Sequence, residues 1–138
     1  MKKILSISMM MVAMMVATFS LVSCSSDDDD NKNNQYRLDI SLNISEPGNL
    51  TEAECEEMIM QAAQRSTVAT HNSDAEAKTA TGMAAQAMAH GLDEAKAGFG
   101  DAVFSYTFKC TKVSNGAQVI TYYVDFSKGD INCYNNEN

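Results

Sequence analysis

The sequence contains few basic and few aromatic residues, and it has no tryptophan. Ten Lys and Arg residues stand against 18 Asp and Glu residues, which gives a formal net charge of −8 at pH 7. Such a chain repels the phosphates of nucleic acids and of anionic lipid headgroups, so we expect no nucleic-acid partner. Aromatic residues make up only 7% of the chain. This scarcity weighs against a glycan-binding site, because such sites usually present flat, exposed rings.

The motifs of common enzyme and metal sites are also missing. The sequence contains no Gly-x-Ser-x-Gly nucleophile elbow and no Cys-x-x-Cys or paired Cys/His spacing of a zinc site. Four glutamates lie together at the start of one predicted helix, where the positive end of the helix dipole explains them: Glu52, Glu54, Glu56 and Glu57. Carboxylate pairs of hydrolases usually come from separate elements. We therefore predict that the protein is not an enzyme and has no cofactor.

Two histidines are the remaining candidates for metal binding. His90 has Asp93 and Glu94 one helical turn away, which is half of a metal site but is more typical of a solvated helix face. His71 lies in a predicted loop, and we expect it to be exposed or to act as a cation at a helix end. No metal site is predicted from either histidine.

The N-terminus has the pattern of an export signal. Lys2 and Lys3 precede an apolar run over residues 4–22, which is short and interrupted by Ser and Thr for a membrane span. The run ends in Leu21-Val22-Ser23-Cys24, which resembles a bacterial lipobox. The resemblance implies that residues 1–23 are cleaved off and that Cys24 carries acyl chains that anchor the protein in a membrane. The alternatives are an ordinary secretory peptide cut nearby and an uncleaved anchor helix.

An acidic tether follows Cys24, over residues 24–35. Ser26, Asp27, Asp28, Asp29 and Asp30 resemble the export signal of surface lipoproteins of the Bacteroidetes type. That resemblance implies an outer-membrane lipoprotein that faces the cell exterior. The alternative is a solvated spacer on a periplasm-facing lipoprotein, because adjacent like charges repel one another and stay extended.

Residues 36–134 are predicted to form one α+β domain, with a polar tail over residues 135–138. Apolar and polar residues alternate over residues 36–44, 102–113 and 118–126, which is typical of half-buried strands. Between the first two strands we predict two helices that begin with capping boxes. One runs from Thr51 (with Glu54) to near Val68, and the other from Ser73 (with Glu76) to about Lys96.

The order is therefore β-α-α-β-β, a three-stranded, mainly antiparallel sheet with one face covered by a helical hairpin. The first strand can pair with either neighbour. The inner face of the first helix is predicted to consist of Cys55, Met58, Ile59, Ala62, Ala63 and Ser66.

The apolar faces of the last two strands predict their register. A three-residue loop, Ser114-Asn115-Gly116, with Gly in the left-handed conformation, brings the two apolar faces together. A two-residue loop would place them on opposite faces. The predicted pairs are Cys110 with Ile120, Phe108 with Tyr122, Tyr106 with Val124 and Phe104 with Phe126.

Three cysteines remain besides Cys24. In the predicted topology Cys55 and Cys133 lie at the same end of the domain, whereas Cys110 lies near the hairpin at the other end. Exported proteins form disulfides, so we predict a Cys55–Cys133 bond with Cys110 buried and free. The alternative is that all three thiols are free.

These observations favour a small cell-surface binding module for an unknown protein or glycan. Its expected contact surface is either the exposed side of the helices or the polar face of the sheet, which carries Arg37, Asp39, Lys109, Thr121, Tyr123 and Asp125. An acidic inhibitor or immunity-type protein that meets a basic partner is the alternative, and an envelope-structural role also remains open.

Overall fold

The computed structural model describes residues 34–64 and 66–137. Seven elements follow one another along the chain: β1 (Gln35–Glu46), α2 (Glu52–Ala63), β2 (Thr67–Thr70), α3 (Asp74–Phe99), β3 (Val103–Lys112), β4 (Gln118–Ser127) and β5 (Asp130–Asn135). The strands form one antiparallel sheet in the order β2-β1-β3-β4-β5. The α+β class is as predicted. The described part of the sheet has five strands, however, where we predicted three.

The two unforeseen strands lie at the edges of the sheet. β2 pairs with the first residues of β1, so the segment between the helices is not a simple interhelical loop. Its residues include Thr67, Val68 and Thr70, whose branched Cβ favours the extended conformation and ends the first helix at Ala63, earlier than predicted.

β5 forms because a tight turn follows β4. Lys128 and Gly129 both have positive φ, 52° and 98°, as a two-residue hairpin turn requires. Ile131 and Cys133 then pack on the core, while Asn132 and Tyr134 are exposed. The predicted last strand ended at residue 126, and no strand was predicted over residues 127–134.

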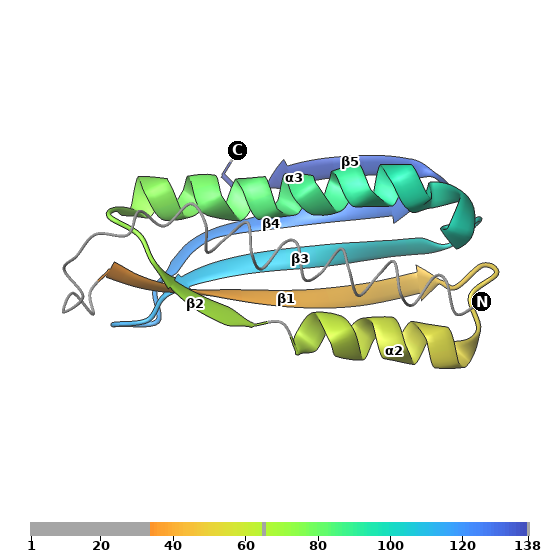
Figure 1. The fold of residues 1–138 in the computed structure, drawn as a ribbon, viewed down its shortest axis with the longest axis horizontal. Helices are drawn as coiled ribbons and strands as arrows, with labels where there is room; N and C mark the ends of the chain where they lie inside the picture. The colour runs from red at the N-terminus through yellow and green to blue at the C-terminus, as the bar shows by residue number, and fades with distance from the viewer. Residues whose placement is uncertain (1–33, 65, 138) are drawn as a thin grey trace.

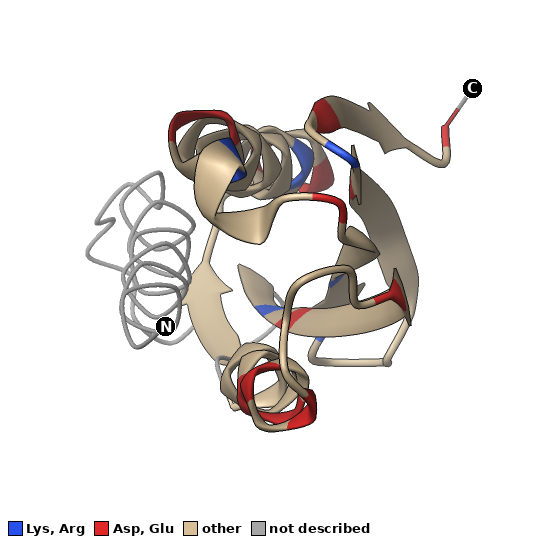
Figure 2. Cartoon of the chain, turned by 90° about the vertical axis from the view of Figure 1, so that its right-hand side faces the viewer, with Lys and Arg blue, Asp and Glu red and all other residues tan. Residues whose placement is uncertain are grey.

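The two helices lie near opposite margins of the sheet (Figure 1). α2 packs on β1, whereas α3 packs on β4 and, to a smaller extent, on β5 and β3. Figure 2, which looks along the strands, shows that the sheet curls and that α3 lies on its concave side. The helices therefore cover one face, as expected, but β2 separates them along the chain and they do not form a helical hairpin.

Both predicted helix starts are present. Thr51 and Glu54 make a reciprocal capping box, with Glu54 N to Thr51 Oγ1 at 3.1 Å and Thr51 N to Glu54 Oε1 at 2.9 Å. Ser73 caps α3 by accepting a hydrogen bond from Glu76 N at 3.1 Å. The return bond differs from the prediction, since Glu76 Oε1 accepts from Asn72 N instead of Ser73 N.

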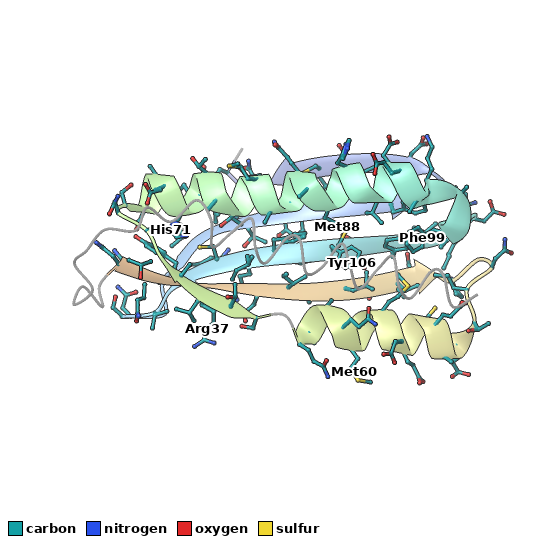
Figure 3. All side chains as sticks on the ribbon, in the orientation of Figure 1. Arg37, Met60, His71, Met88, Phe99 and Tyr106 are labelled. Atoms are coloured by element: carbon teal, nitrogen blue, oxygen red, sulfur yellow. The ribbon has the colours of Figure 1, made fainter. Side chains whose placement is uncertain are left out.

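The buried face of α2 also differs in part from the predicted one. Met58 and Ala62 are fully buried, but Ile59 is 41% exposed and Gln61 lies inside instead. The reason is that α2 packs mainly on one strand, β1, so only a narrow stripe of the helix is covered. Met60, on the same outward side, points away from the sheet in Figure 3.

The core is built on the inner face of the sheet. Phe99, the last residue of α3, packs edge-to-face on Phe104 and Phe126, with ring centroids 5.4 and 5.6 Å away. Phe104 and Phe126 face each other across β3 and β4 in a stack with centroids 4.8 Å apart. Met88 of α3 and Tyr106 of β3 extend the same layer, as Figure 3 shows.

The predicted hairpin register is confirmed. All four predicted pairs, from Cys110–Ile120 to Phe104–Phe126, face each other across β3 and β4. The loop is one residue longer than predicted, since Lys112 pairs with Ala117 and residues 113–116 form the turn. A bulge between the Cys110 and Thr111 pairings absorbs the additional residue. Gly116 has φ +73°, which is the expected left-handed position.

No described helix combines the length and the apolar character that crossing a membrane requires.

Candidate binding surface

The outer face of the sheet carries polar side chains in ordered rows. Strand pairing places Asn43, Ser105, Asp125 and Asn132 directly opposite one another across β1, β3, β4 and β5. The next row toward the hairpin consists of Ser41, Thr107, Tyr123 and Tyr134. Because side chains alternate between the two faces of a strand, all eight point away from the core.

A shallow depression of about 270 Å³ lies at one end of this face. Its polar lining comes from three neighbouring strands and consists of Asn43, Ser45, Ser105, Asp125 and Ser127, with contributions from Val103, Phe104 and Phe126. We call it the outer-face depression. Ser45 Oγ is held at its rim by a 3.2 Å hydrogen bond to the carbonyl oxygen of Val103.

Asp125 is the hydrogen-bonding centre of the outer-face depression. Its Oδ1 accepts from Ser105 Oγ at 2.6 Å, and its Oδ2 accepts from the Tyr134 hydroxyl at 3.0 Å. The bond to Asp125 and partial burial raise the pKa of Tyr134. A carboxylate has about four acceptor positions, so two bonds leave acceptor capacity for a ligand.

Two tyrosines lie in the row next to the depression, and the hydroxyl of one of them bonds to Asp125. Tyr123 and Tyr134 face each other across β4 and β5, and their rings stack with centroids 5.1 Å apart and an interplanar angle of 28°. Tyr134 is 42% exposed. The few aromatic residues of the sequence weighed against a glycan-binding site, but β5 brings a second ring beside Tyr123 on the outer face.

Tyr134, Ser105 and Asn43 were not among the residues predicted for this surface. Tyr134 was missed because β5 was not predicted. A signal was present, namely Gly129 followed by alternation of Ile131 and Cys133 with Asn132 and Tyr134. Ser105 and Asn43 lie at outward positions of predicted strands, but nothing in their spacing distinguishes them from other polar residues there.

The six residues predicted for the polar face do not form one site. Tyr123 and Asp125 lie at or beside the depression, whereas Arg37, Asp39 and Lys109 lie toward the other end of the strands. Arg37 points away from the core in Figure 3. Thr121 is only 4% exposed, because Gln118 Nε2 donates to its Oγ1 at 2.8 Å and Asn136 Oδ1 accepts from its backbone N at 3.0 Å.

The predicted Cys55–Cys133 disulfide is not formed. Cys55, Cys110 and Cys133 are all free thiols in the structure. Cys55 lies on α2 beside β1, whereas Cys133 lies on β5, three strand positions away in the sheet. At about 4.8 Å per strand this is roughly 14 Å, twice the span of a disulfide. The prediction considered only which end of the domain each cysteine occupies and ignored its position across the sheet.

Cys110 is buried and free, as predicted. Burial raises the pKa of its thiol to about 11, so the reactive thiolate is scarce at neutral pH. Burial also raises the pKa values of Cys55 and Cys133. None of the three has the lowered pKa of a catalytic cysteine.

His71 is buried, contrary to the prediction of an exposed loop residue. Its backbone N donates to the carbonyl oxygen of Asn34 at 2.9 Å, which continues the β1–β2 ladder and draws the side chain inward. The ring lies 5.8 Å from that of Tyr36, and Nδ1 lies 3.7 Å from Glu76 Oε1. Burial lowers the pKa of His71 more than the nearby Glu76 raises it.

His90 lies on the exposed side of α3, with Nε2 3.3 Å from Glu94 Oε2 and both side chains more than 70% exposed. In the described part of the chain, no three His, Cys, Asp or Glu side chains are placed together to bind a metal ion. Cys24 and Ser26–Asp30, predicted as the lipidation site and export signal, lie outside the described residues.

Comparison with known proteins adds no relative: the chain matches no protein-family model, no curated protein and no solved structure.

Proposed function

We propose that this protein is a lipid-anchored cell-surface lipoprotein whose domain binds a partner through the outer face of the sheet. The anchor is supported by the sequence Leu21-Val22-Ser23-Cys24, and the surface location by Asp27–Asp30. In this proposal Cys24 carries the lipid, and the membrane is reached only through that lipid.

One observation carries the choice of the outer face. The helices occupy the other side of the sheet, so Asn43, Ser105, Asp125 and the Tyr123–Tyr134 pair stand uncovered on a rigid antiparallel scaffold. Polar groups that are held by hydrogen bonds within the protein are pre-organised, and they lose little entropy when a ligand binds. The exposed side of α3 lacks this arrangement, since its charged residues pair within one helical turn, as in His90–Glu94 and Lys96–Asp93.

The location is tested by adding to intact cells a protease that does not cross the outer membrane. We expect loss of the full-length band, whereas periplasmic control proteins stay intact. The Cys24→Ala variant should leave the membrane fraction. A band that survives in intact cells but is digested in lysed cells would contradict the surface location.

The binding face is tested by placing a photo-crosslinking residue at Thr107 on the outer face and, as a matched control, at Gln86 on the exposed side of α3. Irradiation of intact cells should give higher-mass adducts from position 107 and none from position 86. Adducts from position 86 alone would show that the helix side is the contact surface.

A further inference from the structure

We infer that the outer-face depression and the Tyr123–Tyr134 pair form a recognition site for a neutral carbohydrate. This inference rests on the proposed function, because it names the class of ligand for the same face. Four properties of the described residues support it: the hydrogen-bonding row, the ring pair, the charge and the size.

The hydrogen-bonding row matches a ligand with many hydroxyl groups. The row presents an amide, a hydroxyl, a carboxylate and a second amide across four strands, from Asn43, Ser105, Asp125 and Asn132. Amides and hydroxyls both donate and accept, and the carboxylate accepts. A sugar ring presents adjacent hydroxyls that do the same, so each can donate to one protein group and accept from another.

The tyrosine pair supplies an apolar surface beside this row. Tyr123 precedes Asp125 by two residues on the same face of β4, and the Tyr134 hydroxyl bonds directly to Asp125 Oδ2. The rings are therefore fixed next to the polar groups, both by stacking on each other and by that hydrogen bond. The C–H face of a pyranose packs on such a ring while its hydroxyls reach the carboxylate.

The charge of the depression disfavours anionic ligands. Among the described residues that line the depression, none is Lys or Arg, and Asp125 contributes a negative charge. Phosphate, sulfate and carboxylate ligands are therefore disfavoured. An ammonium ligand would be attracted, but two hydroxyl donors already engage the Asp125 oxygens, an arrangement that suits hydroxyl ligands better than a desolvated cation.

The size of the depression suits a short ligand. Its volume of about 270 Å³ is slightly below the range of small-molecule sites, which starts at about 300 Å³. We expect one or two sugar residues to be contacted, with weak affinity for a single site.

Saturation-transfer NMR on the full chain purified in detergent tests the inference. The probes are methyl glycosides of glucose, galactose, mannose and N-acetylglucosamine, with choline as the cationic probe and inorganic phosphate as the anionic one. We expect signals from at least one glycoside and none from choline or phosphate. Signals from choline alone or phosphate alone would overturn the inference.

Variants locate the site. Tyr134→Ala should weaken glycoside binding about tenfold through the loss of the ring contact. Tyr134→Phe keeps the ring and should have a smaller effect.

Asn43→Ala, on a separate strand, should also weaken binding, so the test holds even if the β5 variant does not fold. Arg37→Ala, on the same face but away from the depression, is the matched control and should bind as the unaltered chain does. Equal binding by all four variants would overturn the assignment.

The outcomes separate this inference from the proposed function. If no glycoside gives a signal but position 107 still forms a protein adduct on intact cells, the carbohydrate inference fails and the proposed function stands. If neither is observed, the outer face is not the binding surface and both the carbohydrate inference and the proposed binding role fail, whereas the surface location is decided by the protease test.

Discussion

A hydrogen bond joins the start of α3 to β1. The hydroxyl of the buried Tyr36 donates to Asp74 Oδ1 at 2.6 Å, and Lys112 Nζ lies 3.5 Å from the same oxygen. The bond from Tyr36, followed by the charge of Lys112, lowers the pKa of Asp74 despite partial desolvation. Burial and the same bond raise the pKa of Tyr36, so both partners keep their protonation states across the physiological range.

The first prediction concerns this bond. Tyr36→Phe should lower the free energy of unfolding at neutral pH by about 1 kcal/mol. Because the folded-state pKa of Asp74 is lowered, its stabilising effect is complete above the unfolded-state pKa, about 3.9, and is lost as pH falls through the folded-state value. Urea unfolding at neutral and acidic pH should show that the difference between variant and unaltered chain shrinks in acid.

Asp74→Asn provides the control for this prediction. In that background the effect of Tyr36→Phe should not depend on pH, because the titrating carboxylate is gone. A difference that stays constant in the unaltered background as well would show that the bond to Asp74 does not carry the effect.

At the scale of elements, turn geometry decides how the strands and helices meet. Gly48, between β1 and α2, has φ +56°, and a Cβ built there would lie 2.6 Å from the backbone N of Ala102. The close approach brings the loop after β1 against the segment that enters β3. Gly116, in the β3–β4 loop, has a similar φ of +73° but no atom within 4 Å of a built Cβ.

The second prediction uses this contrast. Gly48→Ala should cost more than about 2 kcal/mol, since left-handed strain and a clash with rigid backbone add together. Gly116→Ala should cost only the strain, about 1 kcal/mol. Denaturant unfolding of both variants measures the two values. Equal losses would mean that the contact with Ala102 relaxes at no cost.

The confirmed predictions were those that depend on local sequence patterns. The hairpin register followed from the two apolar faces alone, because a shift of one residue would expose every ring from Phe104 to Phe126. The caps at Thr51 and Ser73 followed from residue type and spacing. β2 and β5 were not predicted because they are short, with four and six residues, and are bounded by weak turn signals. Such short segments form strands only where a neighbouring strand supplies hydrogen-bond partners.

At the scale of the whole molecule, β5 completes both the core and the outer surface. Ile131 and Cys133 pack against the core beneath α3, while Tyr134 stacks on Tyr123 on the outside. Beyond the strand, Asn136 bonds to both backbone groups of Thr121, and Glu137 Oε2 lies 2.6 Å from Lys78 Nζ on α3.

The third prediction separates the strand from the tail. A chain that ends at Lys128 should lose roughly 3 kcal/mol or more of stability, because the side chains of Phe126 and Val124 lose the cover of β5 and become partly exposed. A chain that ends at Asn135 loses the exposed Lys78–Glu137 pair, the bond from Glu137 N to Asn135 Oδ1 and the two bonds between Asn136 and Thr121. Loss of the two Thr121 bonds should cost roughly 1 kcal/mol. Thermal or urea unfolding compares them. Similar stability of the two truncated chains would show that β5 is not part of the cooperative unit.

The candidate site depends on tertiary structure more than any single element does. Asp125 and Tyr123 were recognised as outward residues of a strand, but their partners come from β1, β3 and β5. The mispredicted disulfide has the same origin, since the positions of Cys55 and Cys133 across the sheet follow from strand order.

Local patterns in the chain were sufficient for the α+β class, the helix starts, the inner faces of three strands and the pairing of β3 with β4. These features depend on interactions between residues a few positions apart or on the alternation of apolar and polar residues along a strand. Both can be recognised in the sequence itself. The fold alone decided the strand order, the two edge strands, the burial of His71 and the meeting of Tyr134 with Asp125. Each of these depends on contacts between segments that are far apart in the sequence and meet only when the strands pair. The hydrogen bonds and the burial that stabilise them form in the same step.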